Sequence, residues 1–170
     1  TLAFHLGLSV LGLRVWEARR LVDWLATRRD LDASRLGAMG ISGGGMYTLY
    51  SAAVDTRIRA AVISGYFCTY RDSILAMHHC PCNYVPGAAR FGEMADVLGL
   101  VAPRAVLVEA GTRDPIFPLA AVRKGLARAR AIYRAFDPAA GAGNVRLDCF
   151  EGRHQISGRL AYDFLWERLS

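Results

Sequence analysis

Apolar and polar residues alternate along this chain with two different periods, and the period changes several times. An early segment carries five apolar residues at alternating steps of four and three: Leu11, Val15, Ala18, Val22 and Leu25. This spacing predicts an amphipathic helix, because positions three and four apart share one helix face. A turn at residues 32–34 leads into the apolar run 36–41, which has little polar alternation. Such a run predicts a strand covered on both faces.

The same alternation of periods continues to the end of the chain. It predicts helices at residues 46–54, 118–136 and 158–169, and strands at residues 60–64, 105–110 and 145–150. The longest helix has a predicted buried stripe of Val122, Leu126, Ala129, Tyr133 and Phe136. Asp137 and Pro138 should end it. The last strand alternates apolar with charged residues at its start, which is typical of an edge strand.

Four strands separated by helices predict a mostly parallel α/β sheet, because parallel neighbours need crossover connections. We expect a single α/β domain over residues 1–170, interrupted by an irregular excursion at about residues 66–101. The excursion mixes aromatic residues with Pro86 and Gly87 and has short predicted helices at residues 72–77 and 93–98. A long irregular segment of this kind is typical of loops that cover a functional site.

Composition supports a globular protein. Of 170 residues, 53% are hydrophobic and 21% are charged, which lies far from the composition of disordered chains. No stretch approaches the roughly 18 consecutive apolar residues of a membrane-spanning helix, so we expect a soluble protein without a membrane partner. The chain opens at Thr1 without a signal-peptide pattern, and we expect a cytoplasmic location.

The net charge of +6 comes almost wholly from arginine, since Lys124 is the only lysine. The arginines are spread along predicted helices, whereas a nucleic-acid-binding surface would gather them on one face. We therefore expect a solvated basic surface and no nucleic-acid partner.

Four cysteines and a histidine-rich stretch raise the questions of disulfides and metals. Cys80 and Cys82 are too close in sequence to bridge each other comfortably, and Cys68 and Cys149 lie in apolar, strand-like contexts, so reduced thiols are expected. Zinc is an alternative for the stretch 78–82, which contains two histidines and two cysteines. Four ligands within five consecutive residues can hardly surround one tetrahedral ion, so we predict no metal there.

The strongest local motif is GISGGG at residues 40–45, between a predicted strand and a predicted helix. It fits the nucleophile elbow G-x-S-x-G, in which a sharp turn presents a serine, here Ser42, above the sheet. The N–H of Gly43, at the start of the helix, can donate to an oxyanion. An ordinary strand-to-helix turn remains an alternative. A phosphate-binding loop is a weaker one, because no lysine follows the glycines.

Two downstream motifs complete a candidate triad. GTRDPIFP, with Asp114, follows the third predicted strand, and EGRH, with His154, follows the fourth. All three candidate residues should share one rim, because they follow strand ends in a parallel sheet. A turn or capping role for Asp114 and a surface-loop role for His154 remain alternatives. Glu109, inside a strand, and Asp96 are rival carboxylates.

These motifs together with HHCPCNYVPG and APRAVLVEA resemble bacterial esterases related to dienelactone hydrolases and acetylxylan esterases, over nearly the whole chain. The resemblance implies an α/β-hydrolase fold, with Ser42 as nucleophile, His154 as base and Asp114 as the carboxylate that orients it. It implies an ester substrate and no cofactor. Four aromatic residues are expected to line the acyl or alcohol pocket, although each could be merely core: Tyr66, Phe67, Tyr84 and Phe117.

The elements found here resemble only the last four strands of the eight usual in that fold. The strand at residues 36–41 would then be an uncovered sheet edge, so we expect a homo-oligomer or a missing N-terminal segment to cover it. No residue corresponds to the second oxyanion donor, which normally comes from an earlier loop. The predicted function is a carboxylesterase for small or medium acyl groups. A prolyl-oligopeptidase-like peptidase and a non-catalytic subunit-binding fragment are the alternatives.

Overall fold

The computed structural model describes residues 2–139 and 141–170. The strands are β1 (Leu36–Ile41), β2 (Ile58–Ser64), β3 (Ala105–Gly111) and β4 (Val145–Phe150). The α-helices are α1 (Leu2–His5), α2 (Val10–Leu25), α3 (Gly43–Val54), α4 (Met94–Gly99), α5 (Leu119–Phe136) and α6 (Ala161–Leu169). Short 3-10 turns include η2 (Pro81–Asn83) and η3 (Ala88–Arg90) in the excursion.

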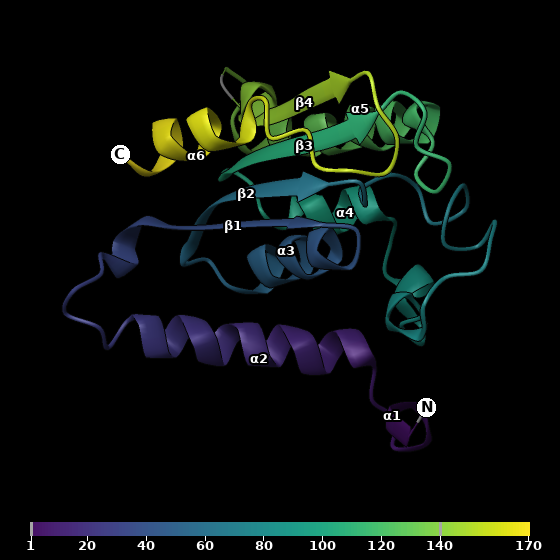
Figure 1. Cartoon of the computed structure of the whole chain (residues 1–170), viewed down its shortest axis with the longest axis horizontal. Helices are drawn as coiled ribbons and strands as arrows, with labels where there is room; N and C mark the ends of the chain where they lie inside the picture. The colour runs from purple at the N-terminus through teal and green to yellow at the C-terminus, as the bar shows by residue number, and fades with distance from the viewer. Residues whose placement is uncertain (1, 140) are drawn as a thin grey trace.

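The four strands form one parallel sheet in the order β1-β2-β3-β4, so each strand pairs with the one before it in the chain. Figure 1 shows the four arrows pointing the same way, with the excursion and the loops after the strands at their carboxyl ends. This arrangement confirms the predicted α/β class, because each parallel pair needs a crossover on a sheet face.

Alternate strand residues face two different apolar layers. Toward α3, α4 and α5 the sheet presents Ala61, Ile63, Val106 and Val108. Toward α6 it presents Ala60, Val62, Ala105 and Leu107. Both faces of the central strands are therefore buried, which explains their nearly continuous apolar sequence. Helix α2 lies outside α3, in the outermost layer of that side (Figure 1).

Strand β1 lies at one end of the sheet, and within the described ranges its only strand partner is β2. The sequence predicted that this strand would form an uncovered edge of the sheet. The GISGGG motif begins within β1, so Ser42 lies at the end of an edge strand of the sheet.

The structure corrects several sequence-based boundaries. Residues 72–77 form turns rather than a helix, with the Met77 N–H donating to the Ser73 carbonyl. Helix α6 begins at Ala161 rather than at residue 158, because Gly158 has a φ of +67° that a helix does not allow. Phe136, predicted to be buried, is 63% exposed at the last turn of α5.

In the described part of the chain, no helix combines the length and the apolar character needed to cross a membrane.

Candidate active site

Ser42 occupies the sharp turn between β1 and α3. Its backbone has φ 54° and ψ −117°, and it is the one non-glycine residue with positive φ in the described ranges. Such a conformation costs on the order of 1–3 kcal/mol and persists only where the surroundings impose it. A Cβ at Gly40 would collide with the Gly44 backbone, and one at Gly45 would lie 2.9 Å from the Ser64 carbonyl oxygen. The glycines of the motif are thus required by close backbone approach.

Gly43 is the first residue of α3. The first N–H groups of a helix have no acceptor within the helix, and the helix dipole favours negative charge at this end. The Gly43 N–H is therefore suited to donate to a developing oxyanion beside Ser42, as the sequence predicts.

His154 and Asp114 form a hydrogen-bonded pair at the ends of β4 and β3. The His154 Nδ1 atom lies 2.9 Å from Asp114 Oδ2. The other carboxylate oxygen accepts from the backbone N–H groups of Ile116 and Phe117, at 2.8 and 3.1 Å. The Asp114 side chain is 2% exposed and that of His154 is 22% exposed. A buried carboxylate held by two amides is well placed to fix the orientation of a partly exposed imidazole.

The end of β2 joins the elbow to this pair. The Ser42 N–H donates to the Ser64 carbonyl at 2.9 Å. The next residue, Gly65, has a φ of +50°, and a Cβ there would lie 3.2 Å from the His154 ring and 3.6 Å from Asp114 Oδ2. The structure thus gathers the three predicted residues around one strand end, while their catalytic roles remain predictions.

An aromatic group covers the imidazole. The Phe117 ring stacks on His154 with centroids 5.8 Å apart, and the centroid of the tilted Tyr66 ring lies 5.4 Å from that of Phe117. The His79 ring meets Phe117 edge-on at 5.9 Å. Tyr66 and Phe117 are 2% and 3% exposed, so they restrict the water around the predicted base.

His79 belongs to the excursion and is buried among other residues of it. Its Nε2 lies 3.2 Å from the Ser73 hydroxyl, and its backbone N–H donates to the Tyr84 hydroxyl at 3.0 Å. Burial lowers the pKa of His79, which keeps the ring neutral near pH 7. The histidine therefore connects the aromatic cover of the site to Tyr84.

The cysteine expectation was wrong in one respect. Cys80 and Cys82 form a disulfide, with Cα atoms 5.5 Å apart. Pro81 lies between them and starts the η2 turn, and the Cα separation is within the usual range for a disulfide. Cys68 and Cys149 are free, and burial raises the pKa of Cys68 to about 12.

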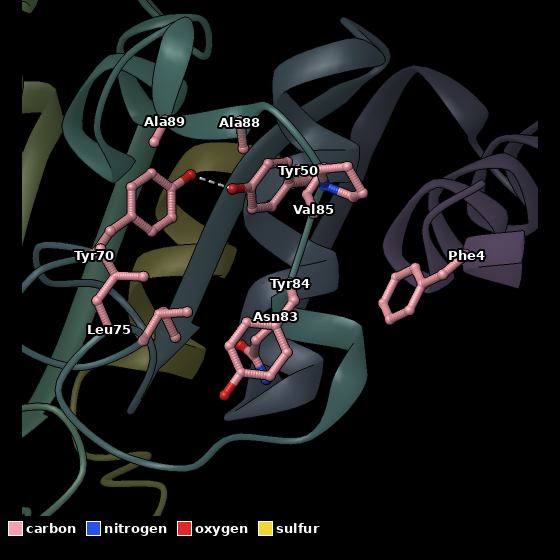
Figure 2. A pocket seen from close by; sticks show the side chains of 11 residues that line it. Phe4, Tyr50, Tyr70, Leu75, Asn83, Tyr84, Val85, Ala88 and Ala89 are labelled. Carbon is pink, nitrogen blue, oxygen red and sulfur yellow. Dashed lines mark hydrogen bonds between the residues drawn. The ribbon is translucent and has the colours of Figure 1, made fainter. Parts of the chain in front are cut away.

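A cavity of about 260 Å³ lies between the excursion, α3 and α1. Figure 2 shows Phe4, Tyr50, Tyr70 and Tyr84 around it, with the hydroxyls of Tyr50 and Tyr70 hydrogen-bonded to each other. Tyr84 is the one predicted pocket residue in its lining. The triad candidates do not line it, so this cavity lies beside the predicted site rather than at the serine.

The remaining predicted residues have other surroundings. Phe67 is 1% exposed and lies against Gly125 of α5, inside the core. Of the rival carboxylates, Asp96 completes the capping box of α4 by accepting from the Glu93 N–H, and it pairs with Arg128. Glu109 bonds to Ser64 rather than to the imidazole. Sequence reasoning missed the role of Ser64 and Gly65, although a glycine directly after a buried strand was a usable signal.

Among the residues with described positions, no three His, Cys, Asp or Glu side chains gather in a way that could hold a metal ion.

No family model matches the sequence. A curated relative, the “Putative hydrolase YtaP” of Bacillus subtilis (strain 168), is 27% identical over 158 residues. That match covers 89% of this chain and 49% of the relative. The chain thus spans about half the length of the curated relative that it matches.

Solved structures of esterases share the fold. A glucuronoyl esterase from Solibacter usitatus superposes with a TM-score of 0.69 at 21% identity, over 89% of this chain and 46% of its own. A recombinant glucuronoyl esterase from Sporotrichum thermophile gives 0.75 at 19% identity, over 95% and 52%. Methylesterase BT1017 gives 0.74 at 25% identity, over 92% and 35%. In each case nearly the whole of this chain corresponds to about half or less of a longer esterase.

Proposed function

We propose that this chain, whose fold is that of the α/β-hydrolase esterases, is the catalytic part of a carboxylesterase-type serine hydrolase. The observation that carries the proposal is the His154–Asp114 hydrogen bond of 2.9 Å, which the end of β2 links to the strained turn at Ser42. A strained serine after a strand and a carboxylate-oriented imidazole at the same rim are the parts that acyl transfer requires.

In the proposed mechanism, His154 removes the Ser42 proton while the serine oxygen attacks the ester carbonyl. The carbonyl oxygen becomes an oxyanion, to which the Gly43 N–H donates. The imidazolium then gives its proton to the leaving alcohol, and an acyl-enzyme forms. Water repeats the sequence with His154 as base and releases the acid. Asp114 keeps the proton on Nδ1, so that Nε2 is free to accept.

The substrate is proposed as an ester of a small or medium acyl group, with Tyr66 and Phe117 beside the reacting centre and Tyr84 farther out. The solved neighbours are named for glucuronoyl and methyl esters, so a substrate panel should include both. None of these neighbours is named a peptidase, and a peptidase function is not favoured.

We also propose that the free edge of β1 is covered in the working protein, by a second copy or by a further segment of a longer chain. The edge bears the nucleophile, and exposed strand edges invite pairing. Size-exclusion light scattering on this chain tests the idea, and a stable monomer that retains full esterase activity would contradict it.

The direct test uses a fluorophosphonate, which reacts with an activated serine. We expect a single adduct on Ser42, identified by peptide mass spectrometry, and none in Ser42→Ala. The far-ultraviolet circular dichroism of the variant should match that of the parent chain. A folded parent chain that stays unlabelled, or a variant that labels equally, would refute the function.

A further inference from the structure

A second acidic side chain lies beneath the proposed triad and takes no part in it. Glu109 is a member of β3, in the otherwise apolar stretch AVLVEAG, and is 1% exposed. A carboxylate at such depth is costly unless its oxygens are fully hydrogen-bonded. The hydrogen-bond partners of Glu109 therefore indicate which parts of the chain this side chain holds together.

Three donors converge on Glu109. Its Oε2 accepts from the Ser64 hydroxyl and, at 3.2 Å, from the Ser157 N–H. Its Oε1 accepts from the Gly158 N–H at 2.9 Å. The donors are separated from Glu109 by 45, 48 and 49 positions, so these bonds join distant parts of the chain.

Of the two segments that Glu109 joins, one supports the turn of Ser42 and the other follows His154. On one side, Ser64 accepts from the Ser42 N–H through its carbonyl at 2.9 Å. On the other, Ser157 and Gly158 follow His154 by three and four residues. The backbone carbonyl of Glu109 also accepts from the N–H of Gly65, which lies against the His154 ring.

Asp148 of β4 holds the same loop from the neighbouring strand. It is paired in register with Glu109 and is 0% exposed. It accepts from the Ser157 hydroxyl at 2.7 Å and from the Arg159 guanidinium. Two adjacent buried acids thus fix consecutive residues of the loop after His154.

We propose that Glu109 is a positioning residue of the esterase site, which locks the loop after His154 to the strand end that supports Ser42. The inference rests on the proposed function. Its distinguishing feature is the need for two acceptor oxygens, because every partner of the side chain donates.

Glu109→Gln tests this with almost no change in shape. Whichever way the amide is turned, its NH₂ group faces the N–H of Ser157 or of Gly158, so one loop bond becomes a clash of donors. Displacement of a catalytic group by about 1 Å costs roughly a hundredfold in rate. We therefore expect the rate constant for fluorophosphonate labelling of Ser42 to fall at least about tenfold.

A second readout follows the imidazole without any reaction. The nitrogen-15 shifts of the His154 ring report which nitrogen carries the proton, and they should change in Glu109→Gln. The matched control is Asp55→Asn. Asp55 is a buried carboxylate before β2, at the opposite end of the sheet, and its Oδ2 pairs with Arg57. The control should lose comparable stability in urea with parent-like labelling and ring shifts.

A folded Glu109→Gln with parent-like labelling and ring shifts would overturn the inference. If that variant does not fold, Ser64→Ala decides, since it removes only the hydroxyl donor. Ser64→Ala should then change the labelling rate and the ring shifts by smaller amounts. If neither of them changes, the proposal is overturned. If the parent chain is not labelled at Ser42, the proposed function fails, and the ring shifts alone still decide whether Glu109 positions His154.

Discussion

Asp114→Asn is the substitution that best separates orientation of the base from stability of the fold. Asp114 Oδ1 accepts from two backbone N–H groups at 2.8 and 3.1 Å, while Oδ2 lies 2.9 Å from His154 Nδ1. In the variant, the two backbone amides hold the carbonyl oxygen of the new side chain in place, because a turned side-chain amide would point NH₂ at both of them. The NH₂ group then faces His154 Nδ1, which must become the acceptor. The ring proton moves to Nε2, and the imidazole can no longer take the Ser42 proton.

The expected loss is large in rate and small in stability. A base held in the wrong tautomer costs about ten-thousandfold in turnover, or about 5.4 kcal/mol of activation free energy. Because the backbone bonds survive, the free energy of unfolding should fall by less than about 1 kcal/mol. Asp114→Ala, by contrast, leaves the buried Phe117 N–H without an acceptor and should cost about 1–3 kcal/mol as well.

The assay pairs labelling kinetics with urea unfolding. The parent chain, Asp114→Asn and Asp114→Ala are each labelled with the fluorophosphonate at pH 7.5 and unfolded under the same conditions. An Asp114→Asn variant that labels within about tenfold of the parent would show that Asp114 does not set the tautomer. An Asp114→Ala variant as stable as Asp114→Asn would show that the two backbone bonds contribute nothing.

Three further outcomes are expected. Gly65→Ala should lower stability by about 1–2 kcal/mol through its φ of +50° and also slow labelling of Ser42, because the new methyl group lies 3.2 Å from the His154 ring. Gly87→Ala, with φ +78° and open space around it, is the control that should share only the first effect. When the chain is unfolded in urea and treated with iodoacetamide, its intact mass should show two adducts, one on each free cysteine, and four adducts after reduction of the disulfide. In the native chain Cys68 should resist alkylation, because burial raises its pKa to about 12. Since burial lowers the pKa of His79 from 6.5, the unfolded chain binds that proton first, and stability should be lost as pH falls below about 6.5. The urea midpoint should fall less between pH 7 and pH 5 in His79→Gln, and an equal fall would exclude this histidine as the cause.

The sheet was predictable because each strand has its own local signature. The run 36–41 and the run 145–150 match β1 and β4 as observed, since apolar runs between turn residues are bounded by local chemistry. The turns at residues 72–77 were mistaken for a helix because a short stretch of suitable residues lacks the length that makes a helix persist.

The interactions that the sequence did not predict are those between distant residues. Glu109 looked only like a rival acid within a strand, since nothing local indicates that Ser64 and Ser157 will meet it. A charged residue in a buried apolar run does require partners, but the pattern cannot say which. The Cys80–Cys82 disulfide was missed for a different reason. Two cysteines separated by one residue are a poor pair on sequence separation alone, and the turn at Pro81 that accompanies their 5.5 Å Cα separation was not predicted.

The strictly consecutive strand order has a consequence for the way the site is completed. Each strand pairs with its predecessor, so the sheet can grow by addition at one side as the chain leaves the ribosome. The turn that holds Ser42 depends on β1, α3 and the end of β2, all of which precede residue 66. His154 and the loop that Glu109 binds are synthesised almost ninety residues later. A nascent chain can thus carry a formed turn at Ser42 before His154 is synthesised, and a premature stop between them would yield a protein that has the proposed nucleophile in place and lacks the proposed base.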